Sequence, residues 1–409
     1  MKRIIQLLTV GATLMALNPI MAQRLTLSPE KPMPGEKITI TYNPAGGELE
    51  GLESFEAIAY VFRSGDPSPE AFEVPLAKSG ENYTGTVSTS ADATAVLFSF
   101  ANEEAKKADA NDDRGYKVLC YKEDRKTVVP GAYAAKGVIY GMYGRYGHVK
   151  RNTEKAVNLF KREYKMYPAS KNNFNYYRSY ASIAKRQNDE EVLAEIQSGI
   201  EATAGNRRAK EEELGQAYQL CKIVGDDDNA QKLKERSLKK FPKGKAAKAD
   251  FVAGFRSLKA TSGKIALLEK FLKTYGDDED SQNTVDYWAS SISNDFAKKK
   301  DWPNFEKYVA MISSNDSKAN AYNNAAWKMS GEGLDGESYD LEKAKQYSGE
   351  ALRLIEEEIE TAAGKPSFMT KSSWRKNMEF SYGMNADTYA LVVYQLGETD
   401  DAFKYQAIA

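Results

Sequence analysis

One short stretch of the chain, from Gly225 to Pro242, sets the pattern that most constrains its fold. Gly225 stands where a helix should end, because glycine tolerates a positive φ, and Pro242 cannot continue the helix that follows. Between them apolar residues recur at helical spacing, which predicts a short amphipathic helix with a basic outer face. Similar landmarks return at Gly144, Ala156, Phe160 and Pro168, at Gly225, Ala230 and Pro242, and at Ala390, Gly397 and Ala402. This recurrence predicts an array of helix pairs that bury their apolar faces against one another.

The first two of these sets resemble the tetratricopeptide repeat, a helix–turn–helix unit of about 34 residues. Phe241 and Tyr275 lie one further step of that length apart. The resemblance implies a curved array whose inner helices form a concave surface for a protein or peptide. The predicted pairs are 175–186 with 190–204, 210–224 with 229–240, 248–258 with 265–275, 284–299 with 304–312, 318–329 with 341–359, and 387–396 with 400 onward. Segments 330–338 and 361–371 are predicted loops.

Residues 1–22 have the composition of an export signal: a basic start, an apolar run from Ile4 to Leu17, and a small-residue cleavage site ending at Ala22. The apolar run is short for a membrane span, and no later segment approaches the required length. We therefore expect an exported, soluble protein of the periplasm or extracellular space. Its net charge of −1 gives no overall basic field for nucleic acid.

Residues 23–136 carry the signals of strands. Apolar and polar residues alternate around Leu25, Ile38 and Tyr116, and clusters such as Pro32–Gly35 and Asn43–Gly47 mark turns between the runs. Several short strands with this punctuation predict an immunoglobulin-like β-sandwich. From Gly137 onward the apolar period changes to that of helices, so 137–409 is assigned to the repeats.

Few residues in the chain suggest chemistry. His148 is the only histidine, and its place near a helix end favours an exposed or dipole-stabilised side chain. The acidic stretch 109–115 is similar to a calcium loop, but its glycine and its last position do not fit one. Cys120 and Cys221 are predicted to be small core residues, with one disulfide as the alternative. Glycines 141, 144 and 147 favour close helix packing over a phosphate cradle. We predict no catalytic residue, no metal site and no cofactor.

An export signal, a sandwich that opens with LTLSPEKPMPGEKITITYNPAG, and a divergent repeat array together resemble the N-terminal part of exported bacterial thioredoxin-like domain proteins. That family implies thiol–disulfide oxidoreduction through a Cys-x-x-Cys pair. The pair is absent from this sequence, as is the βαβ pattern that would carry it, so no catalytic residue is transferred by the resemblance.

The sequence thus predicts an α+β multidomain protein, with an immunoglobulin-like β-sandwich followed by an α-helical tetratricopeptide-like solenoid. Its expected function is that of a non-enzymatic scaffold that binds a protein or peptide partner on the concave face of the repeats. Offset within the repeat gives five candidate partner-binding residues: Arg145, Gln219, Lys222, Leu391 and Tyr394.

Two other functions stay open at this point. The chain is interpreted alternatively as the non-catalytic portion of a thiol–disulfide oxidoreductase whose thioredoxin-like domain is missing after Ala409, because the final predicted helix has no polar cap. A second alternative is carbohydrate binding by the sandwich, which rests on analogy of fold alone. The partner, the oligomeric state and any small-molecule ligand are not specified by the sequence.

Overall fold

The computed structural model describes residues 24–278 and 280–409. The predicted export signal lies outside these residues. Within them the protein is α+β: two antiparallel sheets come first, and fourteen α-helices follow. None of these helices is both long enough and apolar enough to cross a membrane.

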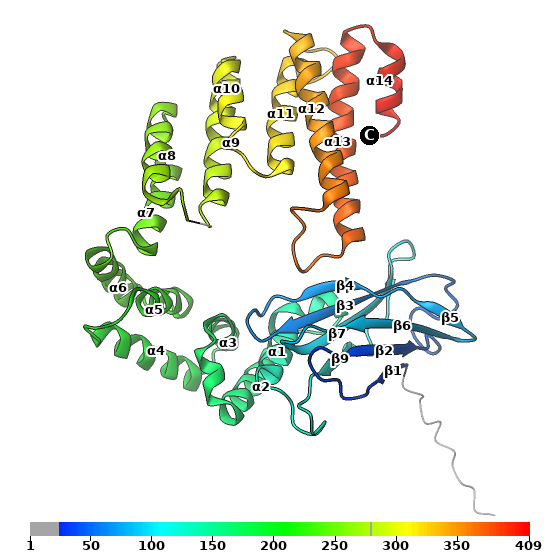
Figure 1. The fold of residues 1–409 in the computed structure, drawn as a ribbon, viewed down its shortest axis with the longest axis vertical. Coiled ribbons are helices and arrows are strands. Elements are labelled where there is room, and N and C mark those ends of the chain that lie inside the picture. The colour runs from blue at the N-terminus through cyan, green and yellow to red at the C-terminus, as the bar shows by residue number, and fades with distance from the viewer. Residues whose placement is uncertain (1–23, 279) are drawn as a thin grey trace, which may run out of the picture.

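The strands divide into two sheets (Figure 1). The first has the order β1-β2-β6-β5 and the second β4-β3-β7-β8, with β9 also paired to β7. Their bounds are β1 Leu25–Ser28, β2 Lys37–Tyr42, β3 Glu56–Arg63, β4 Glu70–Glu73, β5 Ala77–Ser79, β6 Asn82–Ser88, β7 Ala93–Asn102, β8 Lys107–Ala108 and β9 Tyr116–Leu119.

The two sheets pack face to face because their strands alternate. Ile38, Ile40 and Tyr42 of β2 point to one side and are fully buried, against residues of β7 that include Phe100. The Tyr42 and Phe100 rings stack with their centroids 4.0 Å apart. Strand β7 departs from simple alternation, since its first eight residues are all buried. Its second face lies under the first helices, which explains its continuous apolar run.

The helices follow in antiparallel pairs. Their bounds are α1 Ala132–Val138, α2 Thr153–Met166, α3 Phe174–Gln187, α4 Glu190–Gly205, α5 Glu211–Val224, α6 Asp227–Lys240, α7 Lys245–Ser257, α8 Thr261–Tyr275, α9 Gln282–Lys298, α10 Trp302–Val309, α11 Asn315–Met329, α12 Leu341–Thr361, α13 Lys371–Gln395 and α14 Thr399–Gln406, with short π and 3₁₀ turns at 139–147 and 168–172. Helix α1 therefore begins slightly before the predicted boundary at 137.

The landmark residues behave as the sequence predicts. Gly225 ends α5 with φ 87°, and Asp226 accepts a hydrogen bond from the Asn229 N–H at the start of α6. Ala230 and Ala402 are buried second-helix residues. Each landmark thus marks either a helix end or a close contact between helices.

Glycines 137, 141 and 147, at the start of the helical region, allow close packing. A Cβ on Gly137 would lie 2.8 Å from the Phe160 ring, and one on Gly141 would lie 2.4 Å from Ile183 of α3. One on Gly147 would lie 2.5 Å from Leu97 of β7. These glycines therefore let the first helical turns approach both α2–α3 and the second sheet, and the structural interpretation is confirmed.

Helix α13 differs from the prediction. The sequence predicted a loop up to Lys371 and a helix from Asp387, whereas one continuous helix runs from Lys371 to Gln395. Its first half lacks an apolar stripe and contains Gly383, so periodicity could not reveal it. The Thr370 side chain caps it by accepting a hydrogen bond from the Ser373 N–H.

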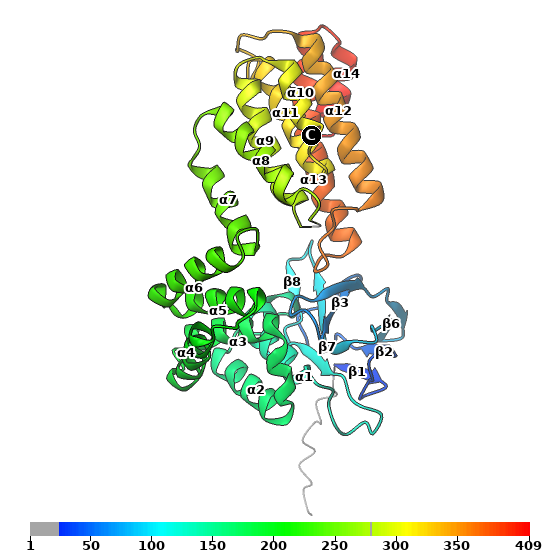
Figure 2. The ribbon, with the colours of Figure 1, turned by 60° about the vertical axis from the view of Figure 1, so that its left-hand side comes forward.

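The helices leave the sheets at α1 and return to them after α12, so sheets and helices together close a ring (Figures 1 and 2). The contact that closes it is made by four residues before and within α13: Ser367, Phe368, Ser372 and Lys376. Ser367 O accepts a hydrogen bond from Ala71 N of the edge strand β4 at 2.8 Å. Lys376 forms ion pairs with Glu103 at 2.6 Å and Glu56 at 3.3 Å. We call these four residues the closing contact.

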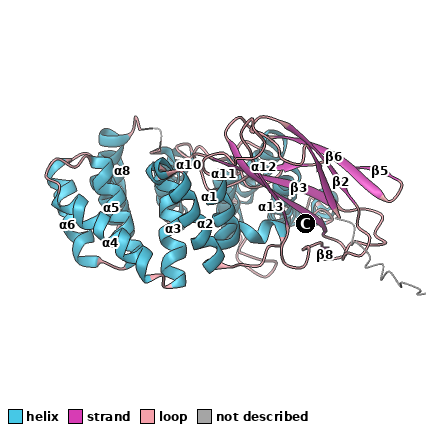
Figure 3. Ribbon diagram, turned by 90° about the horizontal axis from the view of Figure 1, so that it is seen from below, coloured by secondary structure: helices cyan, strands magenta, loops and turns pink. Residues whose placement is uncertain are grey.

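The apolar core of the helices is interrupted between α6 and α7. One cluster runs without a break from Tyr60 and Leu97 of the sheet to Leu233 of α6. Three smaller clusters serve α7 to α14. The α6–α7 junction contains the polar pair Lys234–Asp250, at 2.6 Å. Figure 3, seen from below, shows α3 to α6 as a row extending away from the sheets.

Candidate functional site

The five predicted partner-binding residues fall in three separate places. Arg145 is exposed at the turn before α2, where its guanidinium lies over the Tyr146 ring, 5.1 Å from the centroid. Tyr146 stacks in turn on Tyr60 of β3 and on Phe368 of the closing contact. Arg145 therefore borders the junction of sheets and helices, apart from the other four residues.

Gln219 and Lys222 both lie on α5. The Gln219 side chain accepts a hydrogen bond from Arg178 of α3 at 3.2 Å and lines a groove. Lys222 is paired with Asp227 at 2.6 Å across the α5–α6 turn, and this hydrogen bond raises the pKa of Lys222. The charge of Lys222 is thus neutralised by a carboxylate of its own helix pair.

The groove beside Gln219 lies between α5, α6 and α7 and measures about 440 Å³. Gly215 and Gln219 form the α5 side, and the small residues Ala246, Ala249 and Ala253 form the α7 side. The groove lies at the α6–α7 interruption of the apolar core. Small side chains on α7 leave unfilled the space between the helices that larger side chains would occupy.

Leu391 and Tyr394 line one hollow of about 340 Å³ near the C-terminal end. Its other walls come from α11, from the α11–α12 loop and from α14. The full lining is Trp327, Gly333, Leu334, Asp387, Ala390, Leu391, Tyr394, Ala402, Phe403 and Gln406. We call it the C-terminal hollow.

Large apolar side chains surround the C-terminal hollow without being covered. Leu334 is 70% exposed, Phe403 72% and Tyr394 51%. The loop that carries Leu334 is held by Gln395, whose Nε2 donates to Ser330 O at 2.8 Å. Helix α14 is held by the Tyr389–Tyr405 ring contact, with centroids 4.6 Å apart. Side-chain contacts thus connect both the loop and α14 to α13, and exposed aromatic and leucine side chains of this kind are typical of binding surfaces.

Residues with potential chemistry are held in structural contacts. His148, predicted to be exposed or dipole-stabilised, is half-buried, and its Nε2 lies 3.2 Å from Ser99 Oγ. Burial lowers the pKa of His148. The Asp109 carboxylate accepts hydrogen bonds from Tyr42 at 2.6 Å and Tyr116 at 2.8 Å, and it pairs with Arg24.

The stretch 109–115 forms a turn between strands, and the prediction that both cysteines are core residues is confirmed. Asp109 Oδ1 accepts from Asn111 N in that turn, and the described residues contain no group of acidic, histidine or cysteine side chains placed to hold a metal. Cys120 and Cys221 are free and buried. Burial raises the pKa of the Cys120 thiol to about 12 and that of Cys221 to about 11, which makes both unreactive.

No protein-family model matches the chain, and no curated protein is significantly similar to it in sequence.

Proposed function

We propose that this protein is an exported, non-catalytic interaction scaffold that binds an apolar segment of a partner protein. In this proposal the two sheets form an immunoglobulin-like sandwich and the helix pairs form a tetratricopeptide-like solenoid. The face-to-face packing of the sheets and the recurring Gly, Ala and Pro landmarks at helix ends and contacts support that interpretation.

The observation that carries the proposal is the C-terminal hollow. It combines Trp327, Leu391, Tyr394 and Phe403 in one concave surface, and two of these residues were candidates from the sequence alone. Aromatic residues in a pocket contribute most of the binding free energy at protein interfaces. The hollow offers no carboxylate except that of Asp387, which suits an apolar or weakly basic segment.

The test compares two double variants of matched size and exposure. Peptides are first selected from a displayed random library on the immobilised wild-type protein, and their affinities are then measured by calorimetry. Tyr394→Ser with Phe403→Ser removes the rim of the hollow. Phe380→Ser with Met384→Ser removes side chains of α13 that are 70% and 50% exposed but lie outside the hollow.

We expect the hollow variant to weaken binding by about tenfold or more, because loss of one interface anchor typically costs ~2 kcal/mol. The control variant should bind within about twofold of wild type. Equal binding by both variants would remove the hollow from the proposal. If wild type dimerises in sedimentation and only the hollow variant is monomeric, a second copy of the chain occupies the hollow and the partner proposal is wrong.

A further inference from the structure

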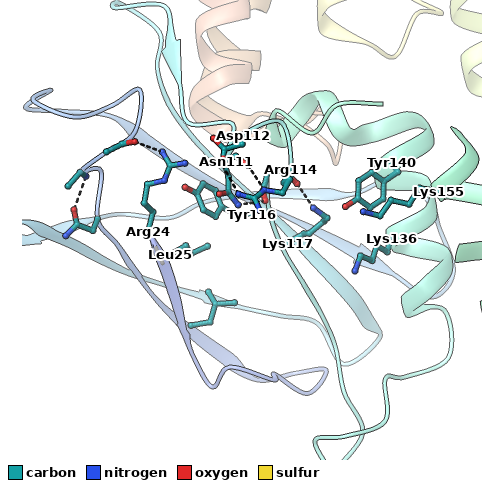
Figure 4. Close-up of a pocket in the computed structure, with 15 residues that line it drawn as sticks. Arg24, Leu25, Asn111, Asp112, Arg114, Tyr116, Lys117, Lys136, Tyr140 and Lys155 are labelled. Carbon is teal, nitrogen blue, oxygen red and sulfur yellow. Dashed lines mark hydrogen bonds and ion pairs between the residues drawn. The ribbon is translucent and has the colours of Figure 1, made fainter. Parts of the chain in front are cut away.

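A larger hollow, of about 750 Å³, lies where the first strand, the 111–115 turn and the first helices meet (Figure 4). One side is formed by β1 and the segment after β2, and the other by β9, α1 and α2. It is far in sequence from the C-terminal hollow and shares no residue with it. The sequence did not indicate it, because its residues come from five separate segments.

The charge of this hollow is strongly unbalanced. Its lining includes the cationic side chains of Arg24, Arg114, Lys117, Lys136 and Lys155. The only acidic residue in the lining is Asp112, which pairs with Arg114 at 2.7 Å, and Arg24 pairs with the neighbouring Asp109 at 3.1 Å. Across 24–278 and 280–409, the three lysines have no carboxylate within ion-pair distance.

Two of the three lysines lie against one phenol ring, and the third is nearby on the same helical segment. Lys155 Nζ lies 4.2 Å and Lys117 Nζ 4.8 Å from the centroid of the Tyr140 ring. Lys136 stands one helical turn before Tyr140, and Figure 4 shows Lys136, Tyr140 and Lys155 on the helical side, with Lys117 on β9 facing them. Burial acts to raise the pKa of Tyr140, but the hydrogen bonds and charges of Lys155 and Lys117 outweigh it and lower that pKa.

This arrangement is unfavourable for the protein by itself. Lys136 is half-buried, and burial lowers the pKa of its amine, as do the positive charges of Lys117 and Lys155, while Tyr140 acts in the opposite direction. The chain has 58 acidic residues to 57 lysines and arginines, so the cluster does not result from a general shortage of carboxylates. Cation–π contact with Tyr140 accounts for Lys117 and Lys155, but it does not account for Lys136.

We propose that this hollow binds a small molecule that carries a multiply charged oxyanion, with a phosphate ester as the best fit. Several ammonium donors around one phenolic hydroxyl match an acceptor group that presents oxygens in several directions. Lys117 also donates a hydrogen bond to Arg114 O, but that carbonyl carries no net charge, so a single carboxylate would neutralise only one of the three lysines. Leu25 and Leu27 of β1 line the opposite wall, where the uncharged part of such a ligand would lie.

The binding test uses pyrophosphate, inorganic phosphate and citrate as probes, measured by calorimetry at constant ionic strength. Wild type is compared with Lys136→Met/Lys155→Met and with the control Lys150→Met. Lys150 is exposed and pairs with Asp113 beside the same turn, but it does not line the hollow.

We expect pyrophosphate to bind wild type, the double variant to lose about tenfold or more in affinity, and the control to stay within about twofold. Absence of pyrophosphate binding to wild type would overturn the proposal, as would equal weakening by the control. Preference for citrate over both phosphates would overturn the assignment to phosphate chemistry.

Thermal unfolding gives a readout that a purely structural role would not produce. Without ligand, Lys136→Met/Lys155→Met should unfold at the same temperature as wild type or higher, because it relieves repulsion and desolvation of unpaired charge. Added pyrophosphate should raise the midpoint of wild type only. If the double variant is clearly less stable than wild type without ligand, the lysines are structural and the proposal fails.

Discussion

The two halves of the molecule differ in how their cores are built. From the second sheet to α6 one apolar cluster is continuous, beside the separate core between the two sheets and a small cluster around Tyr133, and it passes through the glycine contacts that bring the first helices onto β7. From α7 to α14 the core is divided among three clusters, with Trp288 at the centre of one of them. We therefore expect cooperativity to differ along the row of helix pairs, because their stability depends on the contact between neighbours.

The strongest test of this comparison removes one buried ring from each half. Phe160→Ala and Trp288→Ala, both at fully buried positions, should each cost about 3–5 kcal/mol. All four tryptophans lie in the second half, at 288, 302, 327 and 374, so tryptophan fluorescence follows that half alone.

We expect Phe160→Ala to lower the midpoint of the circular dichroism transition while leaving the fluorescence midpoint nearly unchanged. Trp288→Ala should lower the midpoint recorded by the three remaining tryptophans. If Phe160→Ala moves both signals together, the halves unfold as one unit and the interruption at α6–α7 has no energetic consequence.

The second test concerns the ends of the array. Helix α14 has eight residues and buries only Ala402, whereas α5 and α6 are covered on both flanks. Isolated helices so short are marginal in water. Hydrogen exchange of the last twenty residues should therefore be at least about tenfold faster than that of Leu214 to Leu238. Equal protection would mean that another element or a second chain covers α14.

The third test acts on the closing contact through pH. Glu73 Oε1 accepts a hydrogen bond from Ser372 N at 2.7 Å. Partial burial acts to raise the pKa of Glu73, but hydrogen bonds from Ser372 and Thr370 and the charge of Lys371 lower it below 4.5. Stabilisation from this carboxylate is therefore present above pH 4.5 and lost as pH falls through the lowered pKa.

Small-angle scattering should show expansion of the ring as pH falls through the lowered pKa of Glu73. In the Glu73→Gln variant the ring should already be partly open at neutral pH. Glu70→Gln is the matched control, because Glu70 is on the same strand and makes only a 3.8 Å pair with Arg63. Identical scattering of all three proteins over the acid range would contradict the role of Glu73.

The smallest effect is expected from Lys376→Glu. Its ion pairs with Glu56 and Glu103 involve exposed side chains, and such pairs contribute about 0.2–1 kcal/mol each. Energy transfer between dyes on β5 and α13 should decrease slightly in the variant. Arg375→Glu, whose partner Glu379 is on the same helix, should not change it. An equal decrease in both would indicate a general charge effect.

Much of the fold was predictable because its signals are local. Gly225, Pro242 and the alternation around Ile38 each determine structure through their own neighbours. The first half of α13 was missed because residues such as Arg375 and Asn377 give no apolar period there. The closing contact was also missed, since Ser367 and Ala71 are distant in sequence and meet only through the path of the whole chain.

The candidate binding residues also divide into those that local sequence patterns predict and those that only the fold brings together. Leu391 and Tyr394 were placed by repeat offset, and they lie in one hollow because α13 is regular there. Lys222 was placed by the same rule, but the repeat offset does not reveal that its ammonium group pairs with Asp227 across the α5–α6 turn. The lysines around Tyr140 come from a strand and two helices, so no local pattern in the sequence brings them together.

The closing contact is favoured by a high effective concentration of its two sides. Because Ser367 and Ala71 belong to one chain whose helices hold them near each other, their association is intramolecular, and tethered partners typically experience concentrations on the order of millimolar. Contacts too weak to hold separate molecules together can then keep the ring closed. A proteolytic cut between α6 and α7 would remove this advantage, and the released second half would dissociate even though every residue of the contact was intact.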